Sequence, residues 1–352
     1  SQKSSAEAAL ARLSGSVASK AASRKTADTA STALNSNLTN SLSQKAGSQG
    51  TGIGAAAGVN VVENTVDAYV GDNTKVNGSA VSTTADGSLT AVTIAAGGAY
   101  AGKTGAAGAL NVNVIGEQVN ASIGAGASVN ATKEDVSLQA ANDLTVVGIA
   151  GALGVGGTNG VGGGANAEVI HTDTEAVTGE GSSVTAADDI DIKADSKERV
   201  TTVAAAGASG SSVAAAGAIN GNVMNTTTRA AVGKSAKAVA QDSAAVSAAD
   251  DSVYTLVAGS AALSKSSDST NQPGATGAPV NTTPAGQGGV SGQGSSTAAG
   301  GAAAVGVVHK TVQAEIGESA EVNAYAKAGT HDSGLTANDG TIGTKYQAYS
   351  DA

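Results

Sequence analysis

The sequence contains no cysteine, tryptophan or phenylalanine, and only one methionine, three prolines and six tyrosines among 352 residues. The absence of cysteine excludes disulfide bonds and thiolate metal sites. Aromatic rings usually supply much of a compact core, so their scarcity argues against an ordinary globular interior. The 49 glycines and the abundant alanine, valine and isoleucine instead predict a thin, regular core in which small side chains let backbones stack closely. The frequent β-branched residues and low charge argue against disorder.

Basic residues are also scarce: 19 Lys and Arg stand against 29 Asp and Glu, a net charge of −10. This balance, without a basic stripe, argues against nucleic acid or an anionic membrane as a partner. No apolar run reaches the roughly 18 residues of a membrane span, because Gly, Asn and Thr interrupt each one. Residues 1–20 lack a signal-peptide pattern, so an exported protein would be represented here by a mature or internal segment.

One pattern recurs five times: a polar residue, two variable residues, a small or apolar pair, and a glycine. The anchor glycines are separated by 53, 55, 54 and 84 residues. The five copies are TVDAYVG (65–71), QVNASIG (118–124), DTEAVTG (173–179), TTRAAVG (227–233) and TVQAEIG (311–317).

The flanks of the anchors predict strands, because β-branched residues alternate with polar or small ones. Valine follows the anchor five residues later in four copies (Val76, Val129, Val184 and Val322) and six residues later in the fourth copy (Val239). Segments rich in Asp, Asn and Gly then predict turns. These segments are TADG (84–87), AAND (140–143), AADD (186–189 and 248–251) and TAND (336–339).

Two insertions interrupt the repeats. Residues 265–296 contain all three prolines and predict a flexible Pro/Gly/Ser-rich segment. Residues 1–47 predict a helical insertion, since Ser4 and Glu7 form a capping-box pattern and leucines at 34, 38 and 42 follow helical spacing. A mostly disordered, weakly helical tail is the alternative for this segment.

These features predict an all-β, repetitive β-solenoid of five repeats of about 54 residues. We expect two or three coils per repeat and a rod about 50–75 Å long, on a spacing of ~4.8 Å between coils. The Ala/Gly alternation predicts two closely apposed strand layers joined at a short junction. The predicted divisions are 1–47 (helical insertion), 48–264 (solenoid repeats), 265–296 (flexible insertion) and 297–352 (final repeat).

The repeat sequences VNVVENTVDAYVGDNTKVNG (59–78), VNVIGEQVNASIGAGASVNA (112–131) and VVHKTVQAEIGESAEVNA (307–324) resemble those of large leukotoxin-type filamentous adhesins. Those adhesins belong to the wider group of haemagglutinin-like exoproteins of diderm bacteria. The resemblance covers about residues 51–352 and rests on repeated small-residue strands rather than on a site signature. It implies export through the outer membrane and assembly into long β-helical surface fibres.

A P-loop pattern, G-x-x-x-x-G-K-[ST], occurs at GGAYAGKT (97–104). A P-loop lysine begins a helix whose N-terminus holds phosphate. Here a Gly-rich, β-branched segment follows, and the next repeat has GGTNG (156–160) at the same junction. We therefore interpret 97–104 as the end of a strand and a turn. Gly162, Gly163 and Gly164, with Gly154 and Gly156, are likewise interpreted as tight strand packing rather than as a dinucleotide site.

Other candidate groups also favour a structural interpretation. His171 and His309 share one repeat position, eight residues before the anchor, and His331 lies elsewhere. Two repeats separate the first two histidines, so they cannot bind one metal ion within a chain. The pairs Asp188/Asp189 and Asp250/Asp251 could be calcium ligands or glycosidase carboxylates, but turns favour Asp for backbone reasons. Calcium-binding nonapeptides and a Ser/His/Asp arrangement are absent.

We therefore predict no catalytic, cofactor or metal site and a non-enzymatic extracellular protein. Its expected role is a stiff segment of a bacterial surface filament or adhesin. A self-assembling fibre subunit is the second hypothesis, and a polysaccharide-active β-helix enzyme is the third. The expected partners are neighbouring repeats, copies of the chain itself, and host or bacterial surface receptors, but neither nucleic acid nor nucleotide.

Overall fold

The computed structural model describes residues 50–264, 289–290, 297–325 and 344–351. Every regular element among them is a β-strand, which confirms the all-β prediction. The helical insertion predicted at 1–47 lies outside the described residues. Of the flexible insertion predicted at 265–296, only β13 (Gly289–Val290) is described, and it pairs antiparallel with β14.

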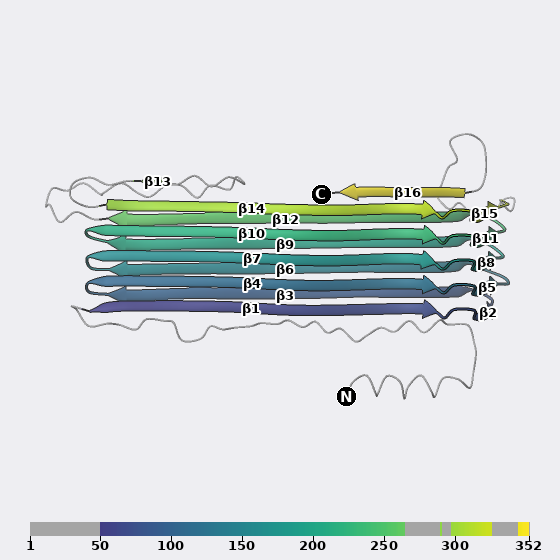
Figure 1. Ribbon diagram of the computed structural model, residues 1–352, viewed down its shortest axis with the longest axis horizontal. Coiled ribbons are helices and arrows are strands. Elements are labelled where there is room, and N and C mark those ends of the chain that lie inside the picture. The colour runs from purple at the N-terminus through teal and green to yellow at the C-terminus, as the bar shows by residue number, and fades with distance from the viewer. Residues whose placement is uncertain (1–49, 265–288, 291–296, 326–343, 352) are drawn as a thin grey trace, which may run out of the picture.

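The strands form three parallel sheets that run side by side through the molecule (Figure 1). Sheet I contains β1 (Thr51–Val70), β4 (Thr104–Ile123), β7 (Asn159–Thr178), β10 (Val213–Val232) and β14 (Thr297–Ile316). Sheet II contains the short strands β2 (Lys75–Gly78), β5 (Ser128–Ala131), β8 (Ser183–Ala186), β11 (Lys237–Ala240) and β15 (Glu321–Ala324). Sheet III contains β3 (Val81–Ala101), β6 (Val136–Gly156), β9 (Ile190–Gly210), β12 (Ala244–Ser264) and β16 (Thr344–Asp351).

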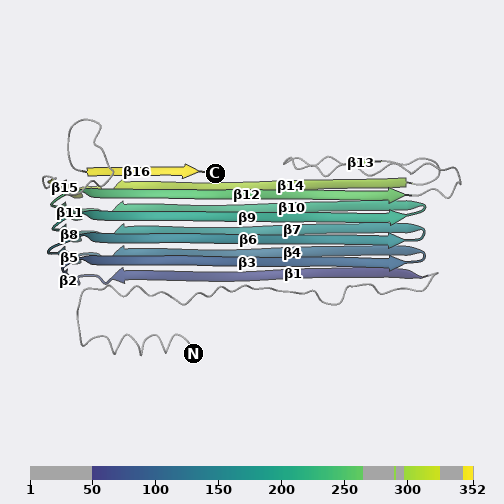
Figure 2. The ribbon, with the colours of Figure 1, turned by 180° about the vertical axis from the view of Figure 1, so that it is seen from behind.

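Each repeat forms one coil of the solenoid. The chain passes along sheet I, turns through sheet II and returns along sheet III, and each of the first three coils leads into the next through a tight turn (Figure 2). Residues paired in sheet I are 53, 55, 54 and 84 apart, so the anchor-glycine spacings are the register of the sheet. The expectation of two or three coils per repeat was wrong, because each long strand continues for 20 or 21 residues where several short ones were expected.

The same strand length corrects the predicted rod of 50–75 Å. Five coils at ~4.8 Å extend only about 20–25 Å along the stacking direction, whereas a 20-residue strand spans roughly 66 Å. The longest dimension therefore lies along the strands, and the molecule is a flat slab. The long strands of sheets I and III lie face to face, since inward-facing glycines of one sheet lie against backbone carbonyl groups of the other.

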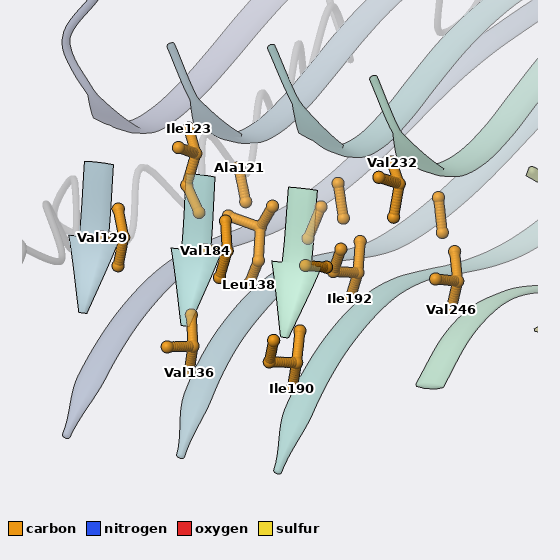
Figure 3. Packing of buried hydrophobic residues seen from close by; sticks show 14 of the residues in the cluster. Ala121, Ile123, Val129, Val136, Leu138, Val184, Ile190, Ile192, Val232 and Val246 are labelled. Atoms are coloured by element: carbon orange, nitrogen blue, oxygen red, sulfur yellow. The ribbon is translucent and has the colours of Figure 1, made fainter. Parts of the chain in front are cut away.

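The interior is broad near sheet II and tapers toward the opposite end of the strands. We define the broad half as residues 62–92 of the first coil and their equivalents, and the tapered half as residues 51–61 and 93–101 and theirs. In the broad half three sheets enclose a triangular core of branched side chains (Figure 3). This core includes Ile123, Val129, Leu138, Val184 and Ile192.

The core of the tapered half consists of alanine. One cluster contains Ala95, Ala99, Ala107, Ala109, Ala150 and Ala152, and a second contains alanines of the later coils. Sheets I and III approach so closely here that a Cβ added to Gly54 would lie 1.8 Å from the carbonyl oxygen of Gly98. The predicted pair of closely apposed strand layers is confirmed.

A left-handed residue follows each anchor glycine by two positions and turns the chain into sheet II. Asn73, Ser235 and Ser319 have φ values of 53°, 53° and 58°, and Gly126 and Gly181 have 62° and 64°. The anchor itself is a glycine because consecutive turns stack tightly: a Cβ on Gly179 would lie 2.4 Å from the amide nitrogen of Ala125. The repeat pattern detected in the sequence is therefore a corner motif.

Candidate functional site

Two bands of polar side chains cross the buried interior from coil to coil. The asparagine band lies at the start of the tapered half, and the acid band lies within the broad half. The asparagine band comprises Asn60, Thr93, Asn111, Asn113, Asn166, Glu168, Thr202, Asn220 and Asn222. The acid band comprises Glu117, Asn142, Thr172, Ser196, Glu198, Thr226, Asp250, Ser252 and Lys310.

Register aligns the asparagine band. Asn111, Asn166 and Asn220 are partners on β4, β7 and β10. Asn111 Nδ2 donates to Asn166 Oδ1 at 2.7 Å, and Asn166 Nδ2 donates to Asn220 Oδ1 at 3.0 Å. Asn220 Nδ2 also donates to the Thr202 carbonyl oxygen of the facing sheet at 2.9 Å. An asparagine ladder therefore links three coils and both long sheets.

Glu168 is buried in this band beside the ladder. Its Oε1 accepts from Asn113 Nδ2 at 2.7 Å. A Cβ added to Gly148 of the facing sheet would lie 1.9 Å from the same oxygen, so the glycine makes room for the carboxyl group. Burial raises the pKa of Glu168 to about 7, against the two amide donors that lower it.

The acid band begins with Glu117 of the second coil. Asn64 Nδ2 of the first coil donates to Glu117 Oε1 at 3.1 Å. Burial, with a smaller repulsion from Glu198, raises the pKa of Glu117 to about 7. The carboxyl group is therefore easily protonated inside the slab.

Glu198 and Asp250 form the centre of the acid band. Glu198 Oε1 accepts from Ser196 at 2.6 Å and from Thr172 at 3.1 Å. The Ser252 hydroxyl lies within hydrogen-bond distance of both Glu198 Oε2 and Asp250 Oδ1, and with a single hydrogen it can donate to one of them at a time. Lys310 Nζ lies 2.9 Å from Asp250 Oδ1. Burial and then the charge of Asp250 raise the pKa of Glu198. Sheets I and III cover all three groups, so they hold the coils together rather than face a substrate.

A third acidic group lies at the corner between sheets II and III. Ligand oxygens of Asp188, Asp189 and Asp242 lie within 4.8 Å of one another. Asp189 Oδ1 accepts from the Ser243 amide at 2.9 Å and the Ser243 hydroxyl at 2.8 Å. In the coil before it, Asp135 Oδ1 accepts from the Asp189 amide at 3.0 Å. Asp135 and Asp189 therefore each bind the backbone of the next coil, which is a structural role.

The two AADD segments are not equivalent. Residues 186–189 form the predicted corner turn, but residues 248–251 lie inside β12. The turns predicted at 84–87 and 140–143 were also wrong, since they lie inside β3 and β6. There the alternation of the long strand continues through the Asp and Asn residues. It directs Asn142 and Asp250 into the acid band, where neighbouring polar groups replace water. The prediction at 336–339 lies outside the described residues.

The P-loop pattern lies at the tip of the tapered half. Gly97 lies in the last, turn-proximal part of β3, which ends at Ala101. Thr104 begins β4, which is a strand rather than a helix. Lys103 contributes its carbonyl oxygen to Thr158 and Asn159 amides, both at 2.9 Å. The interpretation of 97–104 as a strand end and turn is confirmed.

The glycines that the sequence analysis weighed against a dinucleotide site lie on two different faces of their strands. A Cβ on Gly154, Gly156 or Gly162 would lie 1.8–2.1 Å from a facing carbonyl oxygen, which confirms tight packing. Gly163 differs, since a Cβ there would meet nothing within 4 Å. It faces outward.

The histidines lie on the outer face of sheet I. His171 Nε2 is 3.0 Å from Asp173 Oδ2, and its Nδ1 is 3.3 Å from Asn225 Nδ2. Asn225 pairs in register with both His171 and His309, so the two histidines lie two coils apart with one coil between them, as the two-repeat separation in the sequence predicts. His331 lies outside the described residues.

Sequence reasoning missed both buried polar bands. A detectable signal existed, because Asn111/Asn113, Asn166/Glu168 and Asn220/Asn222 occupy the same two repeat positions. Their phase within the alternation places them inward.

The chain matches no protein-family model, no curated protein and no solved structure. The described residues contain no helix that could cross a membrane.

Proposed function

We propose that the chain is a non-enzymatic structural segment of an extracellular filament or adhesin on a bacterial surface. The observation that carries this proposal is the unbroken, in-register stacking of equivalent coils across three parallel sheets. Such stacking satisfies the backbone through hydrogen bonds between coils and yields a stiff object. The resemblance to filamentous adhesins supports the surface location.

The arrangement of the carboxyl groups supports a structural role over the enzyme hypothesis. A polysaccharide-active enzyme needs acidic groups that face one open groove. Among the described residues, Glu117, Glu168, Glu198 and Asp250 are fully covered, and Asp189 is occupied by the backbone and hydroxyl of Ser243.

Immunogold electron microscopy on intact cells of the encoding organism tests the proposal. Antibodies against the purified chain should label material outside the cell envelope without permeabilisation. Labelling that requires permeabilisation would refute the proposed location. Release of soluble sugars from surface polysaccharides by the purified chain would refute the non-enzymatic role.

The self-assembling subunit remains the second candidate, and the match between the first and last coils favours it. Register relates Val59, Val61 and Val62 of β1 to Val305, Val307 and Val308 of β14 through the intervening strands. Lys75 occupies the position of Glu321. Coil-on-coil assembly would therefore place opposite charges together, as Lys237 and Glu321 lie within the chain at 3.3 Å. Filaments of the purified chain, seen by negative-stain microscopy, would distinguish this subunit from isolated slabs.

A further inference from the structure

The outer face of sheet I is uncharged and apolar throughout the tapered half. Alternate residues from Ala106 to Val114 on β4, and those in register with them on β1, β7, β10 and β14, are all Ala, Gly, Val, Ile or Leu. They are not shielded by the described structure: Ile219 is 63% exposed, and Leu110 is 44% exposed.

The extent of this face exceeds what an isolated soluble protein usually exposes. Nine residues along the strand and five strands across correspond to about 700 Å² at the usual strand spacings. The largest apolar patch on a typical monomer is about 300–600 Å². A standard interface buries about 800 Å² on each partner, so the face alone has nearly the area that a stable dimer needs.

The relief of the face fits a second copy of itself. Gly108, Gly163, Gly217 and Gly301 are in register, and the last three line a shallow apolar groove across sheet I. A Cβ at Gly108, Gly163 or Gly301 would meet nothing within 4 Å, so these glycines do not serve the internal packing. Two positions along the strands, Leu110 and Ile219 protrude beside the groove. A groove and a ridge on one patch allow a two-fold pair in which each ridge enters the partner's groove.

We propose that the tapered half of sheet I is the interface of a face-to-face pair of this chain. The pair is lateral: two slabs join through their outer faces, and neither adds a coil to the other. Because the face carries no charge, two copies meet there without repulsion. A lipid surface fits the face less well, because sheet I is flat and the described residues form no basic cluster beside the patch to attract anionic headgroups. Lys103 lies alone at the tip of the strands, and Arg229, farther along sheet I, pairs with Glu315.

The test measures the mass of the full chain by sedimentation over a range of micromolar concentrations. Gly163→Lys places a charge in the groove, and Gly151→Lys is a matched control on the outer face of sheet III. A Cβ at Gly151 also meets nothing within 4 Å, so both variants should fold and retain the wild-type circular dichroism spectrum. We expect twice the chain mass of 33.1 kDa for wild type and Gly151→Lys, and a dissociation constant at least ten-fold weaker for Gly163→Lys.

Four results would overturn the proposal. They are a wild-type monomer at every concentration, equal weakening by both variants, weakening by Gly151→Lys alone, and open-ended assemblies that Gly163→Lys leaves unchanged. Phosphatidylcholine vesicles provide a further arm. Vesicle binding by a monomeric wild type, lost in Gly163→Lys, would assign the face to lipid instead.

Discussion

The two halves of the slab share the same strands but differ in how they use side chains. The broad half has a core of Ile, Leu and Val, and its outer surface carries charges such as Lys193, Arg199 and Arg229. The tapered half has an alanine core, backbone-to-backbone glycine contacts and an uncharged exterior. One fold therefore holds together by two means: side-chain volume in one half and close backbone approach in the other.

The largest expected effect tests backbone approach in the tapered half. Gly162→Val should destabilise the protein by about 4 kcal/mol or prevent folding, because its Cβ would lie 2.1 Å from the Gly207 carbonyl oxygen. Gly163→Val, one residue along, should leave the stability of the single chain unchanged or raise it by about 0.5 kcal/mol, since glycine weakens a strand interior. Urea unfolding measures both. Similar losses for the two variants would contradict the assignment of inner and outer faces.

The next effect tests side-chain volume in the broad half. Leu138→Ala removes most of a side chain that is 1% exposed and should cost about 3 kcal/mol. The matched change in the tapered half, Ala152→Gly, removes one methyl group and should cost about 1 kcal/mol. The comparison uses the midpoint of urea unfolding at constant slope. Equal costs would show that the two cores are not distinct.

A third prediction concerns pH and the boundary between the halves. The folded-state pKa of Glu168, at about 7, lies above the ordinary glutamate value of 4.5, so the folded protein binds the proton more tightly than the unfolded chain does. Its contribution, at most about 3 kcal/mol, is complete below pH 4.5 and is lost as pH rises to about 7. In Glu168→Gln this fall in stability should shrink.

Unfolding free energies of wild type and Glu168→Gln between pH 4 and 8 provide the measurement. Glu117→Gln is the counterpart in the broad half, because the pKa of Glu117 is also raised to about 7. A wild-type protein that gains stability over this interval relative to Glu168→Gln would contradict the buried, protonated state.

The smallest effect concerns the charged exterior. Lys237 and Glu321 lie 3.3 Å apart with both side chains more than half exposed. Lys237→Gln should therefore change the unfolding free energy by no more than about 0.5 kcal/mol, and less at high salt. Urea unfolding at two salt concentrations measures it. A loss of several kcal/mol would contradict the view that the core, rather than exposed ion pairs, stabilises the broad half.

The repeat and its register were accessible from the sequence, because the anchor glycines and their spacings reflect a corner that each coil must form. The number of coils per repeat was not accessible, because Asn142 and Asp250 are residue types that favour turns. Only the alternation of the 21-residue strands around them shows that they lie inside β6 and β12. The acid band was missed for the same reason, because Asn142 and Asp250 belong to it. Local residue type favours a turn there, but the pairing of 20-residue strands with both neighbouring coils determines the outcome.

The exposed apolar face was also missed, for a different reason. Gly162 and Gly163 are adjacent residues of the same type, and only the alternation of the strand distinguishes them. Gly162 faces inward, where a carbonyl oxygen leaves no room for a side chain, whereas Gly163 faces outward and lines the groove. A single-residue change of phase reverses every such assignment. The glycine and alanine content indicated closely packed strands, but it did not indicate which face of the sheet is packed and which is exposed.

The register of sheet I allows the chain to fold coil by coil, because each long strand pairs with its immediate neighbours in the stack. Among the first four coils, each strand of sheet I pairs with residues 53–55 positions earlier or later, and within the described residues every strand of this sheet pairs only with the adjacent coils. A chain that emerges gradually can therefore complete one coil on the preceding one without waiting for its far end. Deletion of a whole repeat would leave compatible neighbours, because Thr51, Thr104 and Asn159 occupy the same place in successive coils. The length of such a protein is thus free to change by whole coils during evolution.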